Sequence, residues 1–192
     1  PSVPAKSLRD LVALAKTMPG KLTYASASPG SGFHMAAERL NMMAGIRTLH
    51  VPYKGGAPAG IALLGGEVDM MFSSPAVVLP HVRTGRMRAI AVSTPGRFSE
   101  LPNVPTMAEQ GMPDFDATAW YGLFAPAGTP RDIVSLLAAR IDAIVRTPEI
   151  REVFRQAGLE SAGGTPEAFD ERVRSDIAKW AKVARAANVK VD

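Results

Sequence analysis

Three short segments combine serine hydroxyls with glycine backbone, and this is the chemistry of a pocket for an anion. They are residues 26–32 (Ser-Ala-Ser-Pro-Gly-Ser-Gly), 53–56 (Tyr-Lys-Gly-Gly) and 73–75 (Ser-Ser-Pro). Glycine lets backbone N–H groups approach a guest, serine adds donors, and the start of a following helix adds partial positive charge. His34, in the turn after the first segment, could also donate to an anion. Turns and helix caps use the same residue types, so a purely structural role is the alternative for each segment.

Other site chemistries fit these residues poorly. Gly30 and Gly32 begin a dinucleotide-binding pattern, but Met35 stands where the third glycine belongs. Ser28 could centre the nucleophile elbow of a hydrolase, but Ser26 occupies the position of the first glycine. The three histidines lack the spacing of metal ligands, and no carboxylate pair is evidently poised for acid–base work. We therefore expect no metal, no cofactor and no catalytic residues.

Alternating strands and helices must position these segments. Apolar runs predict strands over residues 22–26, 48–53, 68–72, 87–93 and 117–125. Helical spacing and capping residues predict helices from Ser7 to Pro19 and over residues 32–44, 57–64, 75–83 and, briefly, 105–110. Such alternation predicts an α/β fold with a mostly parallel sheet flanked by helices. Parallel sheets bind ligands at the carboxyl ends of their strands, where the three segments lie.

The composition of the chain changes near residue 125. Beyond this point we expect helices only, over residues 130–146, 148–157 and 166–187. The charged residues of the last helix, Asp176 among them, predict a solvated face. Trp120 and Tyr121 precede the change, and they are either core or edge aromatics or the wall of a ligand cleft.

The overall composition excludes several classes of protein. The chain has 192 residues, of which 46% are hydrophobic and 21% charged, as in ordinary globular proteins. The absence of cysteine excludes disulfides, thiolate zinc sites and cysteine nucleophiles. The net charge is only +4, aromatics make up 6%, and no four basic residues are consecutive, which argues against a nucleic-acid partner. No apolar stretch approaches the ~18 residues of a membrane span.

Several segments together resemble a known family of receptors. They are residues 24–32 (YASASPGSG), 50–58 (HVPYKGGAP), 64–72 (LGGEVDMMF) and 122–130 (GLFAPAGTP), supported by 101–106 and 177–180. These segments look like the substrate-binding receptors of tripartite tricarboxylate transporters, the Bug-type proteins. The resemblance covers essentially the whole chain.

The resemblance implies a periplasmic type II binding protein, with two α/β lobes around a cleft and no enzymatic activity. Such receptors capture a small carboxylate and deliver it to the permease subunits of a membrane transporter. Many relatives have an aspartate near positions 73 and 74, and its absence here favours a ligand whose distal end is uncharged or anionic. The ligand-binding residues that the resemblance implies are Ser26, Ser28, Gly30, Ser31, Gly32, Phe33, His34, Tyr53, Lys54, Gly55, Gly56, Ser73 and Ser74.

The resemblance also implies a domain organisation. Residues 1–124 correspond to the second lobe, and residues 125–192 to a helical return toward a first lobe that this chain lacks. The apolar faces of helices 130–157 would then lack their usual cover, so we expect a homodimer or a domain-swapped assembly. Two alternatives stay open: the effector-sensing domain of a transcription regulator with the same fold, and a serine hydrolase using Ser28 or Ser31 with His34 or His81.

Overall fold

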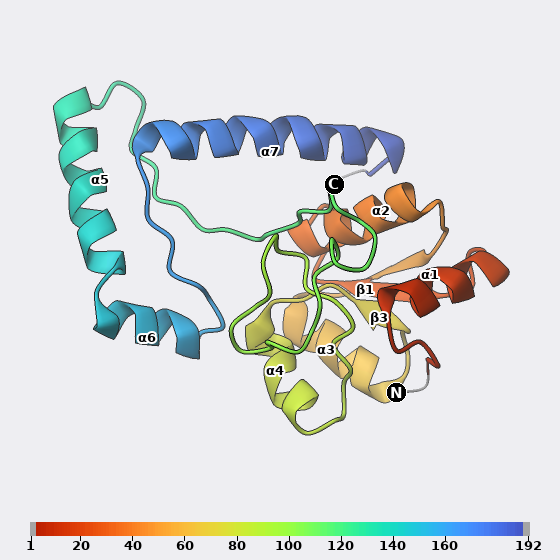
Figure 1. Cartoon of the computed structure of the whole chain (residues 1–192). Helices are drawn as coiled ribbons and strands as arrows, with labels where there is room; N and C mark the ends of the chain where they lie inside the picture. The colour runs from red at the N-terminus through yellow and green to blue at the C-terminus, as the bar shows by residue number, and fades with distance from the viewer. Residues whose placement is uncertain (1–2, 190–192) are drawn as a thin grey trace. The chain divides into compact units, whose positions relative to one another are not determined.

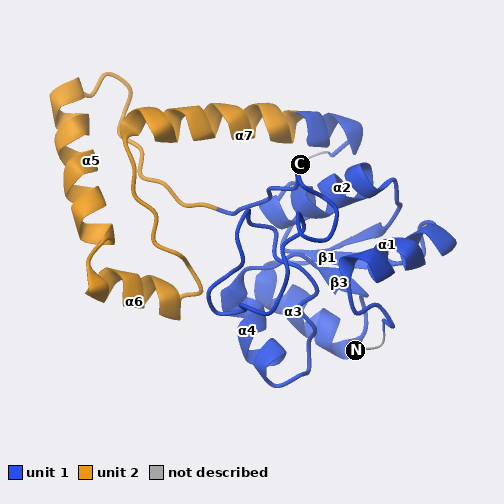
Figure 2. Ribbon diagram, viewed as in Figure 1, with its two compact units in different colours: residues 1–119, 182–192 blue, residues 120–181 orange. Residues whose placement is uncertain are grey.

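The computed structural model describes residues 3–189, and Figure 1 labels its helices and strands. The described residues divide into unit 1, within residues 1–119 and 182–192, and unit 2, residues 120–181 (Figure 2). The elements in chain order are α1 (Leu8–Thr17), β1 (Thr23–Ser26), α2 (Gly32–Ala44), β2 (Leu49–Pro52), α3 (Gly56–Gly65), β3 (Met70–Met71), α4 (Pro75–Arg83), α5 (Arg131–Val145), α6 (Pro148–Gln156) and α7 (Pro166–Ala186). The predicted assignment of residues 1–124 and 125–192 to two parts of a larger receptor stays a prediction.

The sheet of unit 1 has the order β2-β1-β3, and both pairings are parallel. β1 is the central strand: its Ala25 is in register with Val51 of β2 and with Met71 of β3. The predicted parallel α/β architecture is therefore confirmed. Because the strands are parallel, their carboxyl ends meet at one edge of the sheet, and α2, α3 and α4 begin there.

Successive residues of β1 face opposite sides of the sheet. On one side, Ala25 packs with Ala59 and Ala62 of α3 and with Val68, and the small side chains allow the helix to approach the strand closely. Tyr24 and Ser26, both 0% exposed, point to the other side, and Figure 1 shows α2 and α3 on opposite sides of β1. A second buried cluster joins α1 to the rest of unit 1; it consists of Ala5, Leu8, Leu11, Ala15, Leu22, Leu40, Ile46, Met107 and Phe115.

Local sequence signals explain where several helices begin. Ser7 and Asp10 form a reciprocal capping box at the start of α1. Ser31 caps α2, and Pro75 occupies the favoured first turn of α4. The predicted helices 32–44 and 75–83 agree with the observed bounds.

Three predictions for residues 87–125 are wrong. Residues 87–93 and 117–125, all within the described part of the chain, contain no strand, and residues 105–110 form turns rather than a helix. Val92 makes a single parallel bridge to Thr106, with hydrogen bonds from Val92 N–H to the Pro105 carbonyl and from Met107 N–H to the Val92 carbonyl. An isolated bridge pairs too few backbone groups to form a strand.

Unit 2 contains α5, α6 and the greater part of α7, close to the predicted helices 130–146, 148–157 and 166–187. Asp176 of α7 departs from the predicted solvated face, because it is only 6% exposed. Its carboxylate accepts a hydrogen bond from Trp120 Nε1 at 2.7 Å and contacts Lys179 Nζ at 2.6 Å and Arg172 Nε at 3.2 Å. The Trp120 ring also meets Phe169 edge-on, with centroids 5.2 Å apart, so this aromatic side chain has a structural role in unit 2.

Candidate ligand-binding site

The three predicted loops follow β1, β2 and β3 and so lie at the carboxyl edge of the sheet. Backbone hydrogen bonds join the first two loops directly. Gly55 N–H donates to the Ala27 carbonyl at 2.8 Å, and Tyr53 N–H donates to the Ser26 carbonyl at 3.0 Å. Residues 73 and 74 follow β3, which pairs with the other side of β1.

The carbonyl oxygen of Ser28 organises the loop between β1 and α2. It accepts hydrogen bonds from Ser26 Oγ at 3.0 Å, from Ser31 Oγ at 2.8 Å and from Ser31 N–H at 3.2 Å. The adjoining Gly30 has φ +72°, a left-handed conformation that other residues adopt at a cost. The hydroxyls of Ser26 and Ser31 are therefore used to hold the loop.

The side chain of His34 is turned into the protein, with 6% of its surface exposed. Its Nδ1 accepts a hydrogen bond from Gly30 N–H at 2.9 Å. Burial lowers the pKa of His34, and the Glu38 carboxylate opposes this shift. The sequence predicted that His34 donates to an anion. In the structure its imidazole is buried and neutral, and its Nδ1 accepts a hydrogen bond from the loop between β1 and α2, so His34 holds this loop instead.

Several donors at the same edge have no partner among the described residues. In α2 they are the N–H groups of Gly32 and Phe33, which precede the first intrahelical hydrogen bond. Ser28 Oγ is likewise without a partner, and Ser74 begins α4 without donating or accepting a side-chain capping bond. The start of α3 at Gly55 also lacks a side-chain cap. The free N–H groups of α2, together with the starts of α3 and α4 that lack a side-chain cap, are suited to bind the oxygens of a carboxylate.

The remaining predicted residues differ in environment. Lys54 is exposed beside the start of α3 and adds a positive charge to the edge. The Tyr53 hydroxyl donates to the Glu67 carboxylate at 3.5 Å, and burial and Glu67 raise the pKa of Tyr53. Tyr53 is thus held by a residue outside the predicted loops.

The serine–histidine contact that the structure contains does not resemble a nucleophile–base pair open to a substrate. Ser26 Oγ lies 2.6 Å from His50 Nε2, but Ser26 is fully buried. Ser31 Oγ donates to a backbone carbonyl instead of a histidine, and His81 Nδ1 contacts Arg86 at 2.8 Å. Within residues 3–189 there is no group of three or more His, Cys, Asp or Glu residues that could hold a metal ion.

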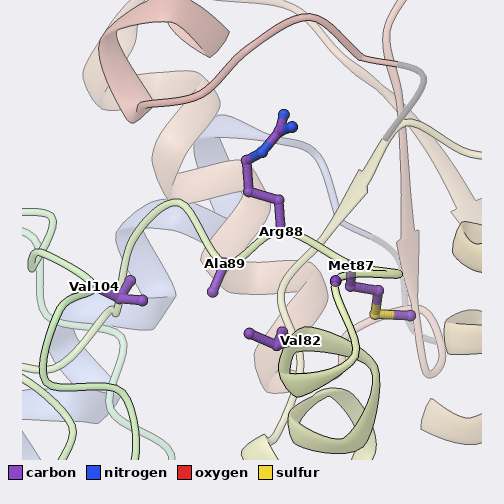
Figure 3. Close-up of a pocket in the computed structure, with 6 residues that line it drawn as sticks. Val82, Met87, Arg88, Ala89 and Val104 are labelled. Carbon is purple, nitrogen blue, oxygen red and sulfur yellow. The ribbon is translucent and has the colours of Figure 1, made fainter.

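Two surface hollows of unit 1 lie outside the predicted loops. One has a volume of about 330 Å³ and is shown in Figure 3; its lining consists of Val82, Gly85, Met87, Arg88, Ala89 and Val104. It adjoins the end of α4 opposite to Ser74, and Arg88 donates to the Ala5 carbonyl at 2.9 Å. The other hollow, of about 400 Å³, lies against α1. Neither contains a residue predicted to bind ligand.

The fold and this edge define a class of α/β binding protein, and comparison with known proteins identifies the family. Residues 1–189 match the model of the tripartite tricarboxylate transporter family receptor. The chain belongs to this family. It is therefore a member of a receptor family rather than an enzyme, and the family match favours this assignment over the effector domain of a transcription regulator.

Relatives of known sequence support the assignment. A UPF0065 protein from the tcbD-tcbE intergenic region of Pseudomonas sp. (strain P51) is 40% identical over 186 residues, which cover 94% of this chain and 55% of that protein. Protein BugT of Bordetella pertussis is 34% identical and is aligned over 100% of this chain and 59% of its own length. The chain thus spans little more than half the length of these two relatives.

Solved structures give the same result. R. palustris Rpa4515, solved with adipate, has a TM-score of 0.84 and 34% identity, covering 98% of this chain and 63% of its own. MatC of Rhodopseudomonas palustris, solved with bound malate, has a TM-score of 0.76 and 31% identity, covering 94% and 62%. The periplasmic binding protein BugD has a TM-score of 0.79 and 31% identity, covering 98% and 64%. These neighbours confirm the predicted fold of a periplasmic binding protein.

Proposed function

We propose that the chain forms the main ligand-binding part of a periplasmic receptor, which binds a small dicarboxylate and delivers it to the permease of a tripartite transporter. The observation that carries this proposal is the convergence of three helix starts, with the unpartnered donors of α2, at one edge of a parallel sheet. The adipate and malate in two structural neighbours favour a dicarboxylate. The described residues contain no helix with the length and apolar character needed to cross a bilayer.

The predicted site residues then fall into two groups. Ligand contacts come from groups that are free at the edge: Ser28, Gly32, Phe33, Lys54, Gly56, Ser73 and Ser74. Support comes from groups already engaged within the protein: Ser26, Gly30, Ser31, His34, Tyr53 and Gly55. No acidic side chain occupies positions 73–75, so nothing in that loop would neutralise an ammonium group. A dicarboxylate is therefore a better ligand than an amino acid.

The domain assignment is part of the same proposal. Residues 1–124 supply the second lobe, and residues 125–192 lead back toward a first lobe. Within the described α5 no residue is buried, and Ile133, Leu136, Leu137 and Ile144 are between 43% and 53% exposed. We expect the isolated chain to cover this helix by forming a homodimer or a swapped assembly. Light scattering that gives a monomer mass over a wide concentration range would contradict this expectation.

Calorimetric titration of the chain with adipate, malate, a monocarboxylate and an uncharged amide of adipate tests the ligand class. We expect heat of binding with the dicarboxylates and none with the amide, because free N–H groups and Lys54 favour carboxylate oxygens. Thermal unfolding in the same solutions provides a second measurement, because a ligand that binds the folded state raises its stability. Equal affinity for the amide and the acids would refute a carboxylate site.

A further inference from the structure

Two histidine rings are stacked beneath the loop that joins β1 to α2. The ring centroids of His34 and His50 lie 3.9 Å apart, with planes 9° from parallel. Tyr24 stacks on the same group, 5.0 Å from His50 and 6.1 Å from His34. Tyr24 is fully buried and His34 nearly so, whereas His50 is half-buried.

The hydrogen bonds determine where each ring carries its proton. Gly30 N–H donates to His34 Nδ1, so this nitrogen keeps its lone pair and the proton of the neutral ring is on Nε2. Ser26 Oγ donates its only proton to the Ser28 carbonyl. His50 Nε2 therefore donates to Ser26 Oγ, at 2.6 Å. Both neutral rings connect to the loop, one through the Gly30 amide and the other through Ser26.

A second proton would act differently on the two rings. On His34 it would occupy Nδ1 and change the acceptor of the Gly30 N–H bond into a donor, so this bond would be lost. On His50 a second proton would occupy Nδ1, so the contact of Nε2 with Ser26 would remain. The protonated His50 would then be a cation stacked on the His34 ring. The titratable groups that face the pair are Tyr24 of β1, whose hydroxyl bonds to Glu38, and Glu38 of α2 itself.

The surroundings keep both rings neutral near pH 7. Burial, and to a smaller extent the neighbouring His34, together lower the pKa of His50 to about 4. Burial also lowers the pKa of His34, against the attraction of Glu38.

We propose that His34 is a positioning residue that holds the loop of residues 27–31 through the Gly30 amide, and that protonation of His34, stacked on His50, releases this loop in acid. His34 does not touch the ligand in this arrangement. It sets the conformation in which Ser28 and the N–H groups of Gly32 and Phe33 face solvent. Its effect on ligand capture rests on the function proposed above, but its effect on the loop does not.

Amide exchange of Gly30 in the full chain, followed by NMR between pH 7.5 and pH 3, measures the loop directly. After correction for intrinsic exchange, we expect the wild-type protection factor to fall at least tenfold as His34 becomes protonated. His34→Asn keeps an oxygen acceptor near Nδ1 and should retain protection through acid pH. His34→Ala should be unprotected even at pH 7.5. His81→Gln, a histidine outside the pair, should behave as wild type.

His50→Gln provides a second variant should His34→Ala not fold. Its amide retains a donor for Ser26, and the pKa of His34 is set by burial and Glu38, so Gly30 protection should still be lost in acid at a pH close to that of wild type. Gly30 protection that stays constant from pH 7.5 to pH 3 in wild type, or that survives in His34→Ala, would overturn the proposal.

Adipate titrations on the same samples separate the two proposals. Weaker adipate binding that follows the loss of Gly30 protection supports both. Absence of adipate binding in the wild type at pH 7.5, with an acid-sensitive Gly30 amide, would contradict the proposed function and leave the positioning role supported.

Discussion

The carboxylate of Asp69 accepts two hydrogen bonds from Thr23, one from the backbone N–H at 2.8 Å and one from the hydroxyl at 2.9 Å. The Asp69 N–H in turn donates to the Thr23 carbonyl at 3.2 Å and to Thr23 Oγ1 at 3.1 Å. Thr23 begins β1 and Asp69 immediately precedes β3. This reciprocal contact therefore fixes the two strands at the amino edge of the sheet, opposite to the candidate site.

Replacement of Asp69 by alanine should lower the free energy of unfolding by about 2 kcal/mol, because it leaves a partly buried N–H and hydroxyl without their acceptor. Thr23→Ser keeps both donors and is the matched control. Urea unfolding followed by circular dichroism measures the difference. An Asp69→Ala variant as stable as Thr23→Ser would show that the contact adds nothing to stability.

Ser28 and Ser31 should separate ligand binding from stability. Ser28→Ala removes an unpartnered hydroxyl, so we expect little change in stability but adipate affinity lowered by about two- to tenfold, the worth of one hydrogen bond. Ser31→Ala removes the cap of α2 and should cost about 1 kcal/mol of stability. Ser7→Ala removes the cap of α1 and should lose comparable stability without loss of affinity. Calorimetry that shows unchanged adipate affinity in Ser28→Ala would remove Ser28 from the site.

Lys54 should act on the ligand through its charge. Lys54→Gln is expected to weaken adipate binding by about two- to fivefold at low ionic strength, and salt should reduce this difference because the side chain is exposed. Lys21→Gln removes an exposed charge at the opposite end of β1 and should leave the affinity unchanged. Titrations of both variants at low and high salt test the prediction. An equal loss in the two variants would indicate a general charge effect.

Trp120 and Asp176 should stabilise unit 2 together. Trp120→Phe keeps the aromatic packing but removes the N–H that donates to the buried carboxylate, at an expected cost of about 1.5 kcal/mol. The fluorescence of Trp180 follows unfolding in this variant. Trp180→Phe in the otherwise native chain is the matched control, because it also leaves a single tryptophan. Equal stability of the two variants would contradict a stabilising role for the Trp120 N–H.

Stability that depends on Asp176 should be lost in acid. Burial raises the pKa of this carboxyl, but Lys179, the Trp120 N–H and Arg172 together lower it by more than burial raises it. The pKa of Asp176 therefore lies below its ordinary value of 3.8. The carboxylate thus contributes stability above about pH 4, and the contribution disappears as the pH falls through its lowered pKa. The difference in urea midpoint between wild type and Asp176→Asn should be largest at pH 7 and should shrink at pH 3. A constant difference would refute the linkage.

Local signals predicted most of the fold. A capping serine, a proline in the first turn and an apolar periodicity predicted α1, α2 and α4 well, because these features act within a few residues. Residues 87–93 show the limit of such signals. Their apolar run has the composition of a buried strand, but strand formation needs a neighbouring backbone, and Val92 finds only the single bridge to Thr106.

In the candidate site, too, local signals predicted some features, and contacts between distant residues determine the others. Glycines, serines and their places after strands predicted which loops meet at the carboxyl edge. The sequence could not predict which hydroxyls remain free, because the Ser28 carbonyl takes those of Ser26 and Ser31 and leaves that of Ser28 without a partner. The position of His50 on β2 beside His34 of α2 likewise follows from strand register and helix packing, which no local pattern encodes.

The central place of β1 has a consequence for synthesis of the chain. The ribosome makes β1 before both of its neighbours, so the strand leaves the exit tunnel with two open edges and its apolar side chains uncovered. Unpaired strand edges promote association with other chains until they are filled. Residues 22–26 therefore need protection while β2 and β3 are still being translated, and we expect slower translation beyond residue 26 to increase aggregation.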